Sequence, residues 1–377
     1  MLGLYVHVPF CAAICNYCNF NRGLFDAALK DAYLHAVRDE IAAAADGAAA
    51  DSVFFGGGTP SLLEPAEIAS ILDTLRRAFA IAPDAEVTLE ANPETVTRQR
   101  LEGYRDVGIN RLSFGVQSFR DEELVRLGRL HSASRAREAV RDARAAGFDN
   151  VSLDLMMWLP QQSKAQWGES IDGLIEAGPD HASLYLLELY PNAPLREAMA
   201  RANWSVAPDD DAADMYLEAM GRLDAAGYRQ YEISNVARPG RESRHNLKYW
   251  RDGEWQGFGP GAHGTRHGIR WKNVSSTPEY ISAVRGRRDL RVEQRVLSGE
   301  ERLEEVLFTG LRLADGLDLS IIAAEYGVDV WARHGEALES FVEGGFLVYD
   351  APILRLTRAG MLLAHEVMTV FISPTVR

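Results

Sequence analysis

The amino-acid sequence predicts an α/β fold, a partial (βα)6 barrel followed by a smaller winged-helix-like α+β domain. Up to about residue 190, short β-branched or aromatic runs alternate with stretches of helical period, which is typical of parallel βα units. Beyond that point the alternation fades into helices, a hairpin and a last helix. The 377 residues also exceed the roughly 250–300 at which a single core stops growing, so we expect more than one domain.

Six runs are expected to form the barrel strands, because each is followed by a polar or glycine-bearing turn and then by a helical pattern. These runs are Leu4–Val8, Ser52–Phe55, Glu86–Glu90, Arg111–Val116, Asn150–Leu155 and His181–Leu187. In βα barrels the functional side chains lie at the carboxyl ends of the strands. The segments directly after the six runs are therefore where we expect a functional site.

The remainder of the chain is expected to hold a connecting segment and the second domain. A helix at Asp209–Ala226 leads into an extended segment at Tyr228–Val236, and a Gly-, Trp- and His-rich stretch runs from Arg238 to Trp271. Further helices are expected near Thr277–Val284, Gly299–Arg312, Leu319–Tyr326 and Trp331–Glu343, then a hairpin at Phe346–Leu356 and a helix at Thr357–Phe371. We therefore predict a barrel over 1–235, a linker over 236–290 and a C-terminal domain over 291–377.

Composition and charge exclude several classes of partner. The chain is 47% hydrophobic and 25% charged, as in ordinary globular proteins, and its net charge of −14 offers no basic footprint for nucleic acid. The N-terminus lacks the basic start and apolar core of a signal peptide, and no apolar run approaches the ~20 residues that span a bilayer. We expect a cytoplasmic protein without a membrane segment.

The three cysteines of the chain are Cys11, Cys15 and Cys18, which stand within eight residues directly after the first strand. Three cysteines cannot form a tetrathiolate zinc site, and zinc would need a fourth ligand such as histidine. An iron–sulfur cluster can instead leave its fourth iron open for a small molecule. The remaining alternative is three incidental buried cysteines. The spacing favours an iron–sulfur cluster.

The pattern Cys-x-x-x-Cys-x-aromatic-Cys resembles the signature of the radical SAM superfamily, whose fold is a partial TIM-like barrel. That resemblance implies a 4Fe-4S cluster on the three cysteines, S-adenosylmethionine (SAM) at the open iron, and an electron donor that allows SAM to be cleaved to a 5′-deoxyadenosyl radical. The run Tyr5-Val-His-Val-Pro-Phe-Cys11 is similar to the HemN-like family of oxygen-independent coproporphyrinogen III oxidase-like proteins. Within it, the heme-chaperone branch called HemW matches best.

Polar or glycine-rich segments follow several of the predicted strands. The triple glycine in Phe54-Phe-Gly-Gly-Gly-Thr-Pro60 allows close backbone approach to a ligand, although a simple turn explains it equally well. Glu90 ends the third strand, where it could bind ribose hydroxyls or ammonium, or only cap a helix. Asp154 stands in an apolar run and needs a partner, either a ligand or a buried salt bridge.

The family resemblance assigns SAM binding to residues in these segments and beside the cysteines. The residues are Tyr5, Tyr17, Gly57, Gly58, Thr59, Glu90, Gln117, Arg129 and Asp154. Gln117 can bond bidentately and Arg129 can pair with a carboxylate, which suits both to a polar ligand. The same resemblance assigns no catalytic residue.

A second candidate site is the segment Arg244-His245-Asn246-Leu-Lys-Tyr249-Trp250. A neutral imidazole binds iron while aromatic rings pack on a porphyrin face, whereas a loop histidine more often makes structural hydrogen bonds. By resemblance, His-Asn-x-x-Tyr-Trp is a motif associated with heme binding, and it implies that His245 is the ligand, with Asn246, Tyr249 and Trp250 beside it.

Departures from the oxidase pattern separate two functional hypotheses. Coproporphyrinogen III oxidases carry a fourth cysteine where this chain has Phe20, and their first strand follows an N-terminal extension that this sequence does not show. The first hypothesis is a heme chaperone that transfers heme to an acceptor protein, and the second is an enzyme that oxidatively decarboxylates coproporphyrinogen III. Both features favour the chaperone. Trp158 replaces a glycine common in the family, and we expect its indole to narrow the cavity. A purely structural winged-helix protein would leave the cysteines unexplained.

Overall fold

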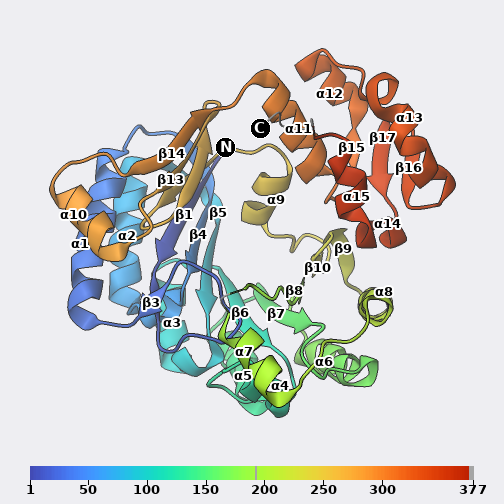
Figure 1. The fold of residues 1–377 in the computed structure, drawn as a ribbon. Coiled ribbons are helices and arrows are strands. Elements are labelled where there is room, and N and C mark those ends of the chain that lie inside the picture. The colour runs from blue at the N-terminus through green and yellow to red at the C-terminus, as the bar shows by residue number, and fades with distance from the viewer. Residues whose placement is uncertain (192, 373–377) are drawn as a thin grey trace.

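The computed structural model describes residues 1–191 and 193–372, which form a large βα unit and a smaller C-terminal domain (Figure 1). Six consecutive parallel strands make the predicted partial barrel, in the order of the chain. They are β1 (Leu2–Val8), β4 (Ala49–Gly57), β5 (Ala80–Ala91), β6 (Arg111–Gln117), β7 (Val151–Met157) and β8 (His181–Leu186). The predicted fold class is confirmed, and the observed strands differ from the predicted ones mainly at their ends.

Helices follow the barrel strands and cover the outer face of the sheet (Figure 1). They are α1 (Ala27–Ala43), α2 (Pro65–Ala78), α3 (Arg98–Asp106), α4 (Asp121–Arg126), α5 (Ala133–Ala145), α6 (Lys164–Ala177), α7 (Pro194–Ala202) and α8 (Asp209–Ala225), with single turns η1 (Pro60–Leu62) and η2 (Pro93–Thr95). Local sequence fixes their starts: Ser163 and Gln166, for example, form a capping box at α6. Strands buried on both faces, such as β1 with Leu4, Val6 and Val8 fully buried, form the core.

Residues 236–290, predicted as a linker, also extend the main sheet. Strands β9 (Arg229–Glu232) and β10 (Asn235–Ala237) form one edge of the sheet. The elements that follow them in the chain are α9 (Arg244–Trp250), β11 (Trp255–Phe258), β12 (His263–Arg266), β13 (Ile269–Asn273), α10 (Thr277–Arg285) and β14 (Arg291–Val296). Strand β11 pairs in parallel with β1, and β12–β14 continue outward as antiparallel strands. Glycines interrupt these short runs, which therefore look like loops in the sequence.

The C-terminal domain packs helices on a small antiparallel sheet, as the winged-helix-like prediction requires. Its elements are α11 (Gly299–Gly310), β15 (Leu317–Asp318), α12 (Leu319–Tyr326), α13 (Val330–Glu343), β16 (Leu347–Asp350), β17 (Ile353–Leu356), α14 (Arg358–Leu362) and α15 (Ala364–Thr369). The predicted last helix is two helices, because Leu363 leaves helical dihedrals with φ −108° and ψ 23°. No helix in the described ranges is long and apolar enough to cross a membrane.

A buried ion pair fastens the C-terminal domain to the edge of the main sheet. Arg312, just after α11, donates from Nη2 to Glu232 Oε2 at 3.0 Å, and Glu232 is fully buried. The same guanidinium stacks over the Trp250 ring, 4.3 Å from its centroid. Burial raises the pKa of Glu232, and the Arg312 charge opposes that rise. Glu232 therefore depends on Arg312 to remain ionised.

Replacing Arg312 with alanine should lower the free energy of unfolding by about 3 kcal/mol, because it leaves a buried carboxylate without its cation. Arg333→Ala, which removes an exposed ion pair with Glu300, should cost less than about 1 kcal/mol. Urea titration of both variants measures the difference. An equal decrease in the free energy of unfolding of the two variants would show that the buried contact with Glu232 stabilises the fold no more than an exposed ion pair does.

Candidate functional site

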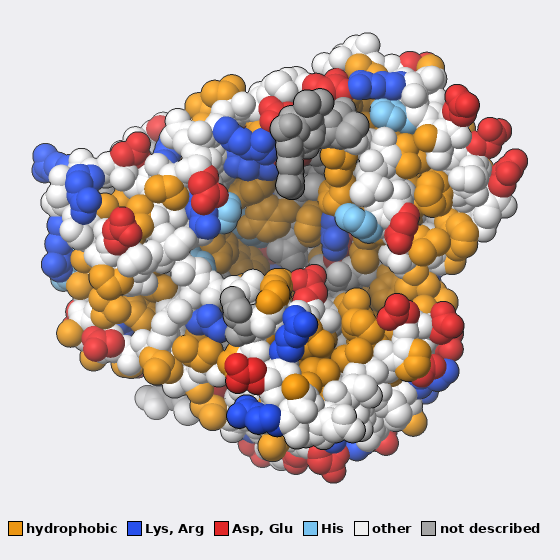
Figure 2. Space-filling model, viewed as in Figure 1, with side chains coloured by type: hydrophobic (Ala, Val, Ile, Leu, Met, Phe, Trp, Pro, Cys, Tyr) orange, Lys and Arg blue, Asp and Glu red, His pale blue; other side chains and the backbone are white. Residues whose placement is uncertain are grey.

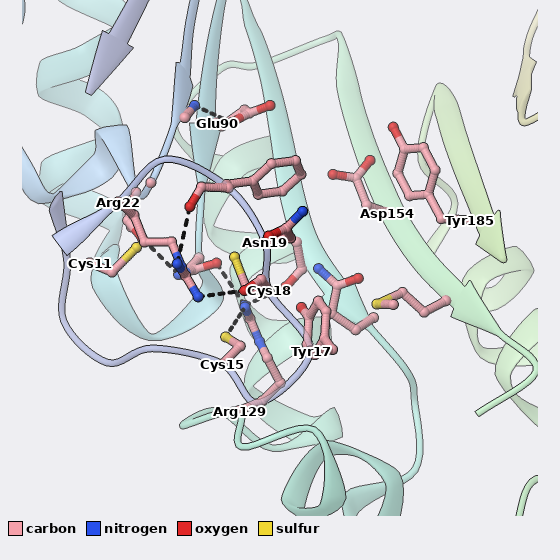
Figure 3. Close-up of a pocket in the computed structure, with 18 of the residues that line it drawn as sticks. Cys11, Cys15, Tyr17, Cys18, Asn19, Arg22, Glu90, Arg129, Asp154 and Tyr185 are labelled. Atoms are coloured by element: carbon pink, nitrogen blue, oxygen red, sulfur yellow. Dashed lines mark hydrogen bonds between the residues drawn. The ribbon is translucent and has the colours of Figure 1, made fainter. Parts of the chain in front are cut away.

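The cysteine loop closes over the carboxyl ends of the first barrel strands. Cys11 lies in the two-residue strand β2 (Phe10–Cys11), which pairs with β3 (Gly23–Leu24), and Cys15 and Cys18 lie in the loop between them. All three cysteines line one cavity of about 370 Å³. Figure 3 shows the loop wrapping around this cavity, with Glu90 reaching it from β5 and Asp154 from β7.

The three thiols suit an iron–sulfur cluster. Thr59 Oγ1 donates to Cys11 Sγ at 3.5 Å, and Arg129 Nη1 donates to Cys15 Sγ at 3.4 Å, contacts that stabilise thiolates. Burial raises the pKa of the Cys11 and Cys18 thiols. Within the described chain no three His, Cys, Asp or Glu side chains converge on one metal-ion position. A cubane cluster binds each thiolate at a different iron, so the thiols need to share a cavity rather than a point.

The triple-glycine loop is held directly against the cysteine strand. Gly58 N donates to Val8 O at 2.7 Å, and Thr59 N donates to Phe10 O at the same distance. A Cβ added to Gly58 would lie 2.6 Å from Phe10 O, and Gly57 has a φ of +113°. Both positions therefore require glycine, since a side chain would push Cys11 away from the cavity or strain the backbone.

Two buried acids face the cavity beyond the glycine loop. Glu90 Oε2 accepts from Gly57 N at 3.2 Å, and Asp154 Oδ1 accepts from Ser113 Oγ at 3.4 Å. Burial, with a smaller contribution from the charge of Asp154, raises the pKa of Glu90 to about 8. The buried Arg111 partly opposes this effect. A ligand that carries an ammonium or sulfonium cation would favour the ionised form of these carboxyls, so the site suits such a cation.

Arg129 supplies the positive side of the same cavity. Its Nη2 donates to Asn92 Oδ1 at 2.6 Å and to Gly115 O at 2.7 Å, while its buried Nε has no hydrogen-bond partner among the described residues. Gly115, whose carbonyl oxygen accepts from Arg129, also lies close to Gln117, because a Cβ on Gly115 would be 2.9 Å from Gln117 Nε2. A carboxylate would satisfy the unused Arg129 donor, as the resemblance to SAM-binding proteins implies.

The structure brings together every predicted SAM residue except Tyr5. Tyr17, Gly57, Gly58, Thr59, Glu90, Gln117, Arg129 and Asp154 line the cavity. The Tyr5 hydroxyl is 3.1 Å from His7 Nδ1, and Tyr5 lines a neighbouring cavity instead. The sequence analysis missed the lining residues Asn19, Arg22, Asn92, Ser113, Tyr185, Glu188 and Tyr190. For Asn92 the signal was present, because it stands just after the predicted strand Glu86–Glu90.

The predicted heme motif does not act as one unit. His245 is buried, with Nδ1 2.9 Å from Ser52 Oγ and Nε2 2.9 Å from the Tyr249 hydroxyl, and burial lowers its pKa to about 3. The Nδ1 contact holds α9 against β4, and the Nε2 contact lies within α9 itself. Both ring nitrogens thus have a partner, and His245 as an iron ligand stays a prediction. The backbone N–H of Asn246 donates to Oγ of Ser243, which caps α9, while Trp250 packs under Arg312 and Tyr249 lines the neighbouring cavity.

Trp158 does not narrow the cavity as expected. Its indole Nε1 donates to Ala207 O at 2.7 Å, and the residue is absent from the cavity wall. The backbone at Trp158 has a φ of +63°, a left-handed conformation that suits the glycine expected at this position. The indole therefore turns toward the segment before α8 rather than toward the cysteines.

Gly58→Ala should reduce the amount of iron retained after anaerobic reconstitution, because relieving the contact with Phe10 O costs about 1–3 kcal/mol or moves Cys11. Gly221→Ala is the matched control, since a Cβ there meets nothing within 4 Å. Iron analysis and the visible absorption spectrum measure the difference. Full iron content in Gly58→Ala would contradict the close approach.

Cation binding near Glu90 should depend on pH. A bound cation favours the ionised carboxylate, so SAM affinity should rise as the pH approaches about 8, by at most about tenfold per pH unit, and then level off. Glu90→Gln should remove this dependence, and Asp154→Asn should move it to lower pH by removing a neighbouring charge. Calorimetric titration with SAM between pH 6 and 9, values chosen to bracket that pKa, checks this. Identical profiles in all three proteins would refute it.

Comparisons with known proteins identify the family of this chain. The model of the radical SAM superfamily matches residues 5–174, and that of the HemN C-terminal domain matches residues 297–363. The heme chaperone HemW of Bacillus subtilis is 35% identical over 99% of this chain and 99% of its own length. HemW of Mycobacterium tuberculosis is 39% identical over 97% of this chain and 93% of its own.

Among solved structures, the coproporphyrinogen III oxidase HemN of Escherichia coli superimposes with a TM-score of 0.87 at 25% identity, covering 98% of this chain and 89% of that one. The matches to both family models and the relatives that are more than 30% identical along the whole chain identify the same family. The chain belongs to the radical SAM superfamily and, within it, to the HemN-like family that includes the HemW heme chaperones.

Proposed function

We propose that this protein is a heme chaperone, which binds heme beside a SAM-ligated 4Fe-4S cluster and passes the heme to an acceptor protein. The observation that most directly supports this proposal is the position of Phe20. Its side chain is 69% exposed on the cavity wall, at the position where the resemblance places a fourth cysteine in the oxidases. The names of the full-length relatives support the same function.

The residues of the cavity divide the task of holding the cofactors. Cys11, Cys15 and Cys18 would hold the cluster, and Glu90 with the backbone of Gly57 would receive the SAM amino group. Arg129 would pair with the SAM carboxylate through its unused Nε. Such a cluster supplies a single electron at low potential, which an electron-donor protein must provide. A cytoplasmic location stays a prediction.

Oxygen-independent oxidation of coproporphyrinogen III remains the second candidate function. The observation that favours it is the close match to the HemN structure along nearly the entire chain. Glu90, Asp154 and Arg129 would serve an oxidase equally well, because they hold SAM in both functions. The two functions differ in what happens to the tetrapyrrole.

Anaerobic incubation with SAM, a reductant and coproporphyrinogen III should yield no protoporphyrinogen IX at catalytic turnover, whereas hemin should bind saturably at about one per chain. The reconstituted protein should hold about four irons per chain, and Cys15→Ser should hold far fewer. Product analysis, hemin titration and iron analysis measure these outcomes. Repeated turnover of coproporphyrinogen III would establish the oxidase function instead.

A further inference from the structure

A second cavity lies beside the cysteine loop, on the side of the added strands β11–β13. Its volume is about 490 Å³, within the range of small-molecule sites. Its lining residues are Tyr5, His7, Asn19, Phe20, Asn21, Tyr249, Trp255, Gly261, Ala262, His263, Lys272 and Ser275. Figure 2 shows one face of the molecule hollowed at its centre, with a hydrophobic floor and with His, Lys, Arg, Asp and Glu side chains near the rim.

One histidine of this cavity differs from the buried histidines of the fold. His7, His181 and His245 each have both ring nitrogens within hydrogen-bond distance of a partner. His263 stands at the start of β12 with an exposed side chain, and no described residue hydrogen-bonds to either of its ring nitrogens. Partial burial and the charge of Lys272 lower the pKa of His263. A neutral imidazole with a free nitrogen is the form that binds iron.

The surroundings of His263 suit a flat apolar ring with acidic substituents. Tyr249 and Trp255 meet edge to face with ring centroids 4.7 Å apart, and the exposed Phe20 adds a third aromatic surface. Lys272 is the cross-strand neighbour of His263 on β13, and its ammonium group lies 3.8 Å from Glu293, a distance too long for a strong pair. The ammonium is thus available to a carboxylate such as a propionate.

The second cavity is joined to the cysteine loop by shared residues. Asn19 and Phe20, directly after Cys18, line both cavities. Asn21 Nδ2 donates to Pro260 O at 2.8 Å and to Ser275 O at 3.0 Å, which fixes the loop before β12 and the segment after β13 to the cysteine loop. Gly261 must lack a side chain here, because a Cβ would lie 2.4 Å from Asn21 Nδ2.

We propose that this second cavity is the heme site and that the His263 imidazole is an axial ligand of the heme iron; the inference rests on the proposed heme-chaperone function. Trp255, Tyr249 and Phe20 contact the porphyrin, and Lys272 pairs with a propionate. The sequence motif around His245 then contributes through Tyr249, while His245 itself keeps α9 in place.

The test is hemin titration of the full chain carrying its cluster, followed by absorption and resonance Raman spectra. His263→Ala should weaken hemin binding at least about tenfold and abolish the spectrum of histidine ligation, and added imidazole should restore that spectrum. His267→Ala is the matched control, because His267 lies on the same hairpin with a 74% exposed side chain outside the cavity. It should behave as the wild type does.

Lys272→Gln provides a second, milder variant. It should weaken hemin binding about threefold without changing the axial-ligand spectrum, since a partly exposed ion pair contributes little. Unchanged affinity in this variant, or an unchanged spectrum and affinity in His263→Ala, would overturn the site. Loss of ligation in His245→Ala with rescue by imidazole would place the ligand at His245 instead. A wild-type protein that binds no hemin would refute the heme-chaperone function itself.

Discussion

The architecture of the site depends on the close approach of two backbone segments, the triple-glycine loop after β4 and the cysteine strand after β1. Parallel pairing of β1 with β4 brings the two carboxyl ends together, and hydrogen bonds from Gly58 and Thr59 then join them. The approach leaves no room for a Cβ at Gly58. This contact positions Cys11 and, through Gly57, also fixes the carboxylate of Glu90.

Buried charge gives the first cavity its selectivity. Glu90 and Asp154 lie on strands β5 and β7, and Arg129 follows α4, so the charges reach the cavity from separate elements. Burial of each of these charged groups costs desolvation free energy, and a zwitterionic ligand with an additional positive charge would offset part of that cost. The second cavity is different in kind, since aromatic rings, one free imidazole and one weakly paired lysine dominate its wall. The segment from Asn19 to Asn21 lies between the two cavities, and two of its three residues line both.

The sequence predicted the barrel because its strands are long, apolar and regularly followed by helical patterns. It also indicated which residues share one cavity, since side chains near strand ends, such as Glu90 and Asp154, converge in a parallel barrel. It did not show β11–β13, whose short runs are broken by Gly257 and Gly264. Burial of His245 was equally hidden, because it depends on Ser52 from a distant strand. The place of Tyr5 in the wall of the second cavity was hidden for a similar reason, since it depends on packing between distant segments, and its role in SAM binding stays a prediction.

The proposed heme site adjoins the proposed cluster site through Phe20, which lines both cavities. Zinc protoporphyrin IX, a fluorescent heme analogue, tests it directly when bound to the cluster-loaded protein and to the cluster-free Cys15→Ser variant. The account predicts similar affinity in both proteins and a much shorter fluorescence lifetime when the cluster is present, because a nearby iron–sulfur cluster quenches the excited porphyrin. Equal lifetimes in the two proteins would contradict it.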